Sequence, residues 1–268
     1  MGRIGERMAA LRARGERALV PYVTAGDPDL GVTEALLPAL EAAGADLLEI
    51  GVPFSDPVAD GPTIQRASER GLRAGATLRR VLGLVKTLRP RLSIPLLLMG
   101  HANPFLAMGE REFAEAAREA GVDGVIIPDL PPEEEPDFFA ALEACGIDAV
   151  LLAAPTTREE RLAMLARRTR GFLYYVSLTG VTGARSALPP HLAENLARIR
   201  RVSDVPVCVG FGVATPDQAA RIGELADGVV VGSALVARIA AAGSREQAVS
   251  DAAEFVAALK APLRGRRG

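Results

Sequence analysis

Hydrophobic and polar positions follow two patterns that alternate along the chain. Short runs rich in Val, Ile and Leu recur between longer segments of helical periodicity, with Gly or Pro at the joins. This alternation predicts repeated βα units, in which parallel strands are joined by helices. Eight strands are expected, near Ala18–Thr24, Leu47–Val52, Ile94–Met99, Gly124–Pro128, Ala149–Ala153, Phe172–Ser177, Val205–Gly210 and Gly228–Val231.

A helical segment is expected after each strand, and a short repeat marks where several helices end. Gly44-Ala45-Asp46, Gly121-Val122-Asp123 and Gly146-Ile147-Asp148 each lead from a helix into a strand, and Ala226-Asp227-Gly228 is a looser copy. Glycine just after a helix supplies a left-handed cap residue at little steric cost. The units are therefore expected to be structurally equivalent. The clearest amphipathic helices are Glu110–Ala120, Pro132–Ala144, Arg158–Arg167 and Glu246–Lys260.

Eight units without a dividing linker favour an α/β fold with a single closed (βα)8 TIM barrel, one domain spanning residues 1–268. An open doubly wound sheet is disfavoured, because the first strand runs into Thr24-Ala25-Gly26-Asp27-Pro28 without a G-x-G-x-x-G dinucleotide fingerprint. The residues before Ala18 are expected to form an extra N-terminal helix that closes the bottom of the barrel.

Composition narrows the classes of function. The net charge is −2 and the basic residues are scattered, so a nucleic-acid partner is not expected. The first twenty residues lack the apolar run of a signal peptide, and no later stretch is apolar enough to span a membrane. The chain is therefore expected to be cytoplasmic, with Cys145 and Cys208 as reduced thiols.

In this fold, chemistry is expected at the C-terminal ends of the strands. On the second strand, Glu49 shares a face with Leu47 and Gly51, so it should point into the barrel near the catalytic mouth. A buried acid there must be either paired or shifted to a higher pKa, and a structural salt bridge is the alternative to a catalytic role.

The loop after this strand, residues 53–62, carries Asp56 and Asp60 on a proline-bounded segment. Asp60 could supply a second proton-transfer group, or it could cap the helix that begins near Pro62. Asp56 could order the loop or face a partner.

Glycine-containing loops follow the last three strands. Gly210-Phe211-Gly212 and Gly232-Ser233 lie where phosphate-binding barrels cradle the anion, although packing or turn roles are the alternative. Residues 179–186, which include Thr182 and Gly183, form a candidate lid or an ordinary flexible connection. Before that loop, Tyr174 shares a strand face with Phe172 and Val176, and this face could line a substrate pocket or simply the core.

The positions of basic residues disfavour two other chemistries. The only lysines, Lys86 and Lys260, lie in predicted outer helices, so an imine-forming lysine in the barrel is not expected. His101 and His191 are isolated, which disfavours a metal site. His101 follows the third strand and is interpreted as a structural histidine. Acid–base chemistry by carboxylates is therefore the expected mechanism.

Taken in order, these motifs resemble the α subunit of tryptophan synthase over nearly the whole chain. The match runs through residues 21–28, 49–62 and 129–131, and then through residues 180–183, 210–212 and 232–233. Residues 49–62, Glu-Ile-Gly-Val-Pro-Phe-Ser-Asp-Pro-Val-Ala-Asp-Gly-Pro, are its most specific part. Two positions depart from the common pattern: Tyr22 stands where many members have Phe, and His101 where another aromatic is frequent.

The resemblance implies retro-aldol cleavage of indole-3-glycerol phosphate to indole and glyceraldehyde 3-phosphate, a lyase reaction of tryptophan biosynthesis. It implies that Glu49 transfers protons at indole C3 and the glycerol hydroxyl, and that Asp60 binds the indole N–H. It further implies no cofactor in this chain, and an αββα complex with a pyridoxal-phosphate β subunit toward which Asp56 faces. The implied substrate-binding residues are Tyr22, Tyr174, Thr182, Gly183, Gly212, Gly232 and Ser233.

Two other functions are alternatives to this interpretation. One is a related barrel, such as an indole-glycerol-phosphate synthase or a phosphoribosylanthranilate isomerase, and the former needs a barrel lysine that this chain lacks. The other is a non-catalytic phosphate-binding barrel subunit, which would have no need of Glu49 and Asp60.

Overall fold

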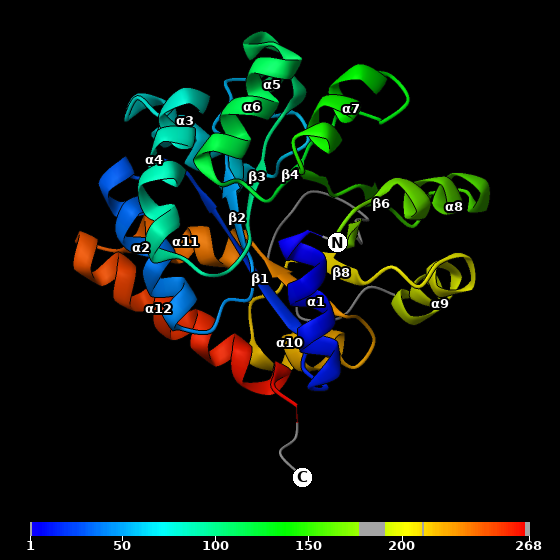
Figure 1. Ribbon diagram of the computed structural model, residues 1–268. Coiled ribbons are helices and arrows are strands. Elements are labelled where there is room, and N and C mark those ends of the chain that lie inside the picture. The colour runs from blue at the N-terminus through cyan, green and yellow to red at the C-terminus, as the bar shows by residue number, and fades with distance from the viewer. Residues whose placement is uncertain (1, 177–190, 211, 266–268) are drawn as a thin grey trace.

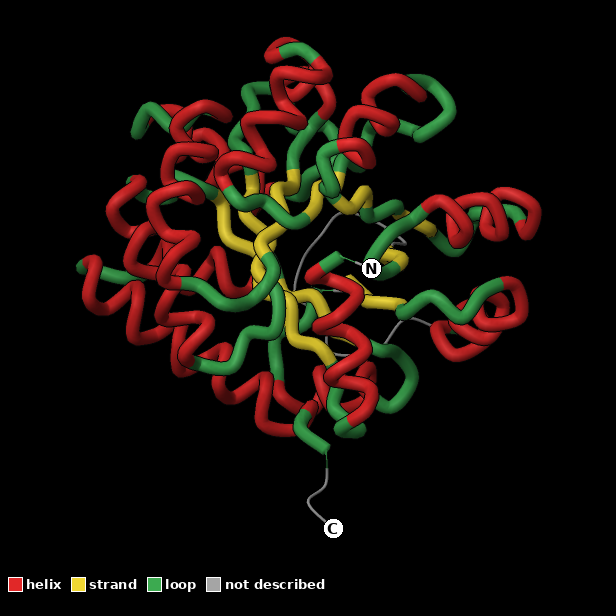
Figure 2. The backbone as a smooth tube through the Cα atoms, in the orientation of Figure 1, coloured by secondary structure: helices red, strands yellow, loops and turns green. Residues whose placement is uncertain are grey.

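The strands of the computed structural model form one parallel sheet that curls around a central axis. The model describes residues 2–176, 191–210 and 212–265. Within these ranges the strand order is β5-β4-β3-β2-β1-β9-β8-β7-β6. Figure 2 shows the strands in yellow at the centre, with red helices around them. The strands are β1 Ala18–Thr24, β2 Leu48–Gly51, β3 Leu96–Met99, β4 Gly124–Ile126, β5 Asp148–Ala149, β6 Leu152–Ala153, β7 Leu173–Val176, β8 Val207–Gly210 and β9 Gly228–Val231.

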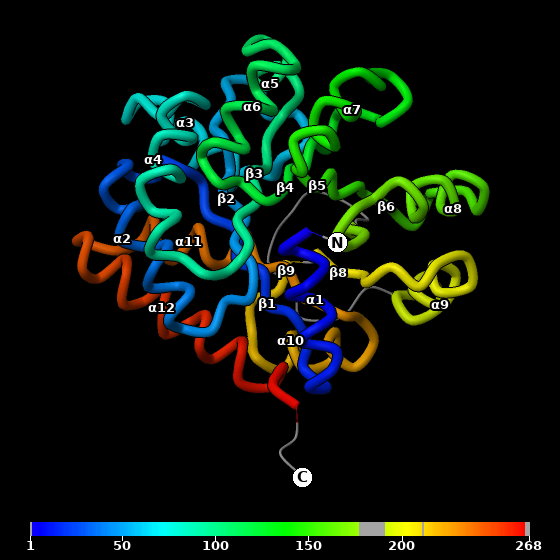
Figure 3. The backbone as a smooth tube through the Cα atoms, viewed as in Figure 1, coloured from blue at the N-terminus to red at the C-terminus, as the bar shows by residue number. Residues whose placement is uncertain are grey.

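The expected fifth strand, Ala149–Ala153, is present as two shorter strands. β5 pairs with β4, whereas β6 pairs with β7 on the other side. Between them, Val150 N–H donates to Val125 O and Leu151 O accepts from Tyr174 N–H, both at 2.9 Å. These bonds continue the ring of strands through this segment, whose two short strands are labelled β5 and β6 in Figure 3. The other expected strands are confirmed over the described residues, and most are shorter by a residue or two at their ends; Ser177, the expected end of the sixth strand, lies outside the described residues.

Helices surround the sheet and connect consecutive strands (Figure 1). α6 has the expected limits, α8 is shifted by one residue at both ends, and α12 begins one residue earlier than expected. The expected start at Pro132 is wrong, because Glu135 precedes a proline and adopts φ −130° and ψ 65°, which is not helical. The helices are α1 Arg3–Ala13, α2 Leu30–Ala42, α3 Pro62–Arg73, α4 Leu78–Leu88, α5 Ala102–Met108, α6 Glu110–Ala120, α7 Pro136–Ala144, α8 Glu159–Arg168, α9 Leu192–Val202, α10 Pro216–Gly223, α11 Ser233–Ala241 and α12 Arg245–Lys260, with short 3-10 helices at Arg89–Arg91 and Ala261–Leu263.

The two largest apolar cores among the described residues follow from the alternation of side chains along each strand. The larger core lies between the strands and the helices, and on β1 it includes Leu19 and Val23. The smaller core fills the barrel, and on β1 it includes Ala18 and Val20. Glu49 faces this interior, since its strand neighbours Leu48 and Ile50 belong to the outer core.

The expected extra helix closes the N-terminal end of the barrel. Ile4, Met8 and Leu11 of α1 are buried in the interior core. Figure 1 shows α1 in blue across this end of the strands. A methyl group on Gly124 of β4 would lie 2.7 Å from Ile4 Cδ1, so the helix packs directly on the strand ends. Over the described ranges, no helix is both long and apolar enough to cross a membrane.

Three Asp residues of the sequence repeat bind amides of neighbouring strands at this same end. Asp46 accepts a hydrogen bond from Leu19 N–H at 2.9 Å, and Asp123 accepts one from Leu96 N–H at 2.8 Å. Asp227 similarly accepts from Val207 N–H at 3.0 Å. Each carboxylate thus satisfies an amide near the start of an adjacent strand. The repeat stabilises the N-terminal face and leaves the C-terminal face to the functional loops.

Candidate active site

Glu49 is a fully buried acid on β2, inside the barrel. Neither of its carboxylate oxygens has a hydrogen-bond partner among the described residues. Burial without compensation disfavours the charged form and raises the pKa of Glu49 to about 8. The side chain is therefore mainly protonated at neutral pH. The alternative of a structural salt bridge is wrong for the part of the chain that the structure describes.

Tyr22 and Tyr174 place their hydroxyl groups against glycines at the C-terminal end of the barrel. A methyl group on Gly51 would lie 2.1 Å from the Tyr22 oxygen, and one on Gly210 would lie 2.5 Å from the Tyr174 oxygen. Burial, with a further contribution from the charge of Glu49, raises the pKa of both tyrosines. The three side chains therefore share one poorly solvated space.

Asp60 lies in the loop that leads from β2 into α3. The helix cap is Gly61, which has no side chain to accept a hydrogen bond, so the helix-capping interpretation of Asp60 is wrong. Burial raises the pKa of Asp60, the neighbouring His101 lowers it, and Asp129 raises it. Asp60 also contributes to the raised pKa of Tyr22. The second carboxylate therefore lies at the same mouth as Tyr22 and Glu49.

His101 lies beside these groups, although from the sequence it is interpreted as a structural histidine. It is buried at the start of α5, and its Nε2 accepts a hydrogen bond from Ala59 N–H at 3.4 Å. Its ring stacks on Phe54, with centroids 5.6 Å apart. One signal was available from the sequence, since His101 directly follows the third strand and so lies on the functional face.

The proposed phosphate end of the site lies next to Tyr22. Gly232 caps α11, of which Ser233 is the first residue, and a methyl group on Gly232 would lie 3.7 Å from Tyr22 Cβ. Gly212 follows β8 with φ 42°, a backbone conformation that favours glycine. Thr182 and Gly183 lie outside the described residues.

An apolar wall borders the mouth. Tyr22 packs with Ile64 and Ala67 of α3 and with Val236 of α11, and Met99 of β3 packs against this cluster. Ile64, Met99 and Val236 are not predicted from the sequence as site residues, because an apolar residue carries no chemical signal until its neighbours are known. Their packing gives the polar groups a hydrophobic boundary on one side.

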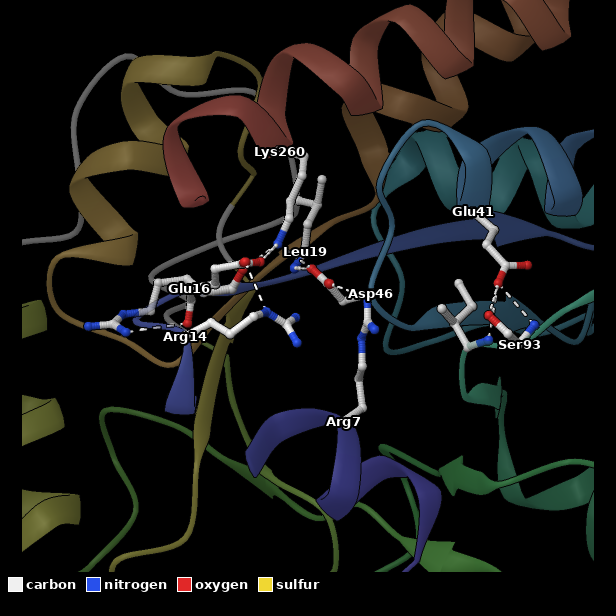
Figure 4. Close-up of polar contacts among 10 residues, drawn as sticks. Arg7, Arg14, Glu16, Leu19, Glu41, Asp46, Ser93 and Lys260 are labelled. Carbon is white, nitrogen blue, oxygen red and sulfur yellow. Dashed lines mark hydrogen bonds and ion pairs between the residues drawn. The ribbon is translucent and has the colours of Figure 1, made fainter. Parts of the chain in front are cut away.

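The two lysines lie elsewhere, as expected. Lys86 is exposed on α4, with its Nζ 3.7 Å from Glu119. Lys260 is buried at the N-terminal face, where its Nζ contacts Asp46 at 2.8 Å (Figure 4). Neither lysine reaches the C-terminal mouth. Among the described residues, no three His, Cys, Asp or Glu side chains are grouped so as to hold a metal ion.

Comparisons with known proteins point to one family. The family model described as "Tryptophan synthase alpha chain" matches residues 8–264. The tryptophan synthase alpha chain of Geobacter sp. (strain M21) is 53% identical over 236 residues, 88% of each chain. The solved structure of tryptophan synthase subunit alpha from Legionella pneumophila is similar with a TM-score of 0.91 and 38% identity, covering 98% of both chains. A chain of Mycobacterium tuberculosis tryptophan synthase has a TM-score of 0.90 and 39% identity, and the match covers 98% of this chain and 99% of that one.

Proposed function

The chain belongs to the tryptophan synthase alpha chain family, and we propose that Glu49 and Asp60 carry out its reaction. That reaction is the retro-aldol cleavage of indole-3-glycerol phosphate to indole and glyceraldehyde 3-phosphate. The observation that carries the proposal is the fully buried, unpaired carboxyl group of Glu49 at the mouth of the barrel. A silent binding subunit would have no use for so costly a group.

Glu49 supplies the proton transfers. Its raised pKa keeps it protonated near neutral pH, so it can donate a proton to C3 of the indole ring. The resulting indolenine accepts the electrons of the breaking carbon–carbon bond. The Glu49 carboxylate then removes the proton of the glycerol hydroxyl, which becomes the aldehyde, and the acid form is restored. The substrate itself serves as the electron sink.

Asp60 stabilises the charge that forms during this sequence. Protonation at C3 places positive charge on the ring nitrogen, whose N–H a carboxylate can bind. The effect of Asp60 on the pKa of Tyr22 supports its location at the same mouth. Asp60 is consequently an electrostatic partner, while Glu49 performs both proton transfers.

The remaining site residues bind the two ends of the substrate. Gly232, Ser233 and Gly212 hold the phosphate, for which the start of α11 offers backbone N–H groups and a favourable helix dipole. Tyr22 and Tyr174 border the indole and glycerol portions, beside the apolar wall that includes Ile64. Thr182 and Gly183 complete the substrate site on the basis of the family resemblance.

A β subunit is the partner of this family, and it is expected to hold pyridoxal phosphate while this chain has no cofactor of its own. The surface around Asp56 supports the proposal that this loop faces the β subunit. Val58, two residues away, is an apolar side chain with 74% exposure, and it borders a surface groove together with Asp56 and Leu72. Exposed apolar residues with a polar rim are typical of protein interfaces.

The experiment follows indole release from indole-3-glycerol phosphate by the purified chain, in the presence of a chelator and without pyridoxal phosphate. Indole and glyceraldehyde 3-phosphate should appear in equal amounts, and addition of the β subunit should accelerate their release. Absence of both products with and without the β subunit would refute the proposed function.

A further inference from the structure

His101 connects three loops at the C-terminal face of the barrel. It follows β3, its Nε2 accepts from Ala59 N–H in the loop after β2, and its ring stacks on Phe54 of the same loop. The next residue, Ala102, donates its N–H to Asp129 Oδ1 at 2.9 Å, in the loop after β4. The His101 segment therefore bridges the loop that carries Asp60 and the loop that carries Asp129.

The contact with Ala59 fixes the protonation state of the imidazole. A backbone N–H can only donate, so Nε2 must carry a lone pair and the proton of the neutral ring must lie on Nδ1. Protonation of Nε2 would turn the acceptor into a donor and break the bond. The hydrogen bond that restrains the loop therefore requires a neutral His101.

The charged groups that face His101 come from both neighbouring loops. Asp60 and Asp129 lie close enough for their charges to affect one another, and His101 lowers the pKa of Asp60 while Asp129 raises it. Ala59 immediately precedes Asp60, so a hydrogen bond from the Ala59 N–H also restrains the backbone of the acid. The neutral imidazole thus acts on the position of Asp60 through its hydrogen bond to Ala59.

We propose that His101 is a positioning residue for Asp60, which it holds through the Ala59 hydrogen bond and through stacking on Phe54. The role in catalysis rests on the proposed function, whereas the physical link between His101 and the loop does not. Neutral His101 keeps the Asp60 segment in place for the indole N–H.

The physical link is tested by nitrogen NMR of the folded chain with ¹⁵N-labelled histidine. The chain has two histidines, and the exposed His191, whose Nδ1 lies 3.0 Å from Glu194, serves as an internal control. Neutral His101 should show the proton on Nδ1, and an Ala59→Pro variant, which has no N–H to donate, should change the His101 signals and leave those of His191 unchanged. A His101 spectrum with the proton on Nε2 would overturn the proposal, whether or not the chain releases indole.

The catalytic consequence is tested with two variants. His101→Phe preserves the stacked ring but removes the acceptor, and it should lower kcat about tenfold with KM changed less than about twofold. His101→Gln restores an acceptor of similar reach and should recover part of kcat. Circular dichroism and urea unfolding establish that both variants fold. Wild-type kcat in both folded variants would overturn the positioning role.

Discussion

Tyr22 and Glu49 are direct partners on adjacent parallel strands, at the same level of the barrel. The Tyr22 hydroxyl extends past Glu49 to the space above Gly51, where it also contacts Thr24 Oγ1 at 3.3 Å. The position of the Tyr22 ring therefore depends on the absence of a side chain at Gly51. This relationship links backbone geometry on β2 to the chemistry proposed for the site.

Glu49 should make the stability of the chain depend on pH. Its pKa is about 8 in the folded chain against an ordinary value of 4.5, so the folded state keeps a proton that the unfolded state releases. Between these two values the unfolding free energy should fall as pH rises. Glu49→Gln should remove this contribution and be more stable than the wild type at pH 8. The difference in unfolding free energy between the two proteins should be at most about 5 kcal/mol. Urea unfolding of both proteins at several pH values measures the difference, and a difference that is constant with pH would contradict the raised pKa.

Asp60→Asn should affect catalysis and leave folding nearly unchanged. Asp60 does not cap α3, so its replacement removes no helix-end hydrogen bond. The amide lacks the negative charge that the ring nitrogen needs, and kcat should fall roughly a hundredfold or more, with a smaller change in KM. Steady-state kinetics and thermal unfolding measure the two effects. A lower unfolding temperature with unchanged kcat would indicate a structural role instead.

Gly51→Ala should displace Tyr22. The added methyl group would lie 2.1 Å from the hydroxyl oxygen and 2.5 Å from the carbon that bears it, so the ring must move. Overpacking of this kind costs about 1 to 3 kcal/mol. We expect reduced stability together with a loss of kcat/KM. Gly83→Ala is the matched control, because a methyl group there meets nothing within 4 Å, and equal effects of the two substitutions would argue against the packing role.

Lys260→Met should lower the stability of the chain and leave its kcat nearly unchanged. The Lys260 ammonium is buried and contacts Asp46 and Arg17 O, while Arg7 binds the other oxygen of Asp46 at 2.7 Å (Figure 4). Removing one partner of a buried ion pair costs about 3 to 5 kcal/mol. The group lies at the N-terminal face, away from the proposed site, so kcat of the folded fraction should stay within about twofold of the wild type. A selective loss of kcat without loss of stability would contradict this separation.

The sequence predicts the fold better than it predicts the site. The spacing of apolar runs and the Gly-x-Asp repeat are local signals, and in the structure Asp46, Asp123 and Asp227 bind amides of neighbouring strands. The division of the fifth strand is not visible in the sequence, because it depends on which neighbour each end pairs with.

Within the site, strand alternation places Glu49 correctly in the barrel. The capping pattern around Asp60 is misleading, since glycine can also begin a helix and does so at Gly61. The role of His101 depends on contacts with Ala59 and Phe54 across two loops, and no spacing along the chain reveals them.

The central claim is that Glu49 transfers the protons in the cleavage of indole-3-glycerol phosphate. The most direct measurement compares kcat for indole release by the wild type and by Glu49→Gln at neutral pH, with urea unfolding to establish that the variant is folded. The buried side chain has no hydrogen-bond partner among the described residues, so the amide should fold while losing the transferable proton. A loss of at least about a hundredfold is expected. A folded Glu49→Gln variant with kcat within twofold of the wild type would contradict the account.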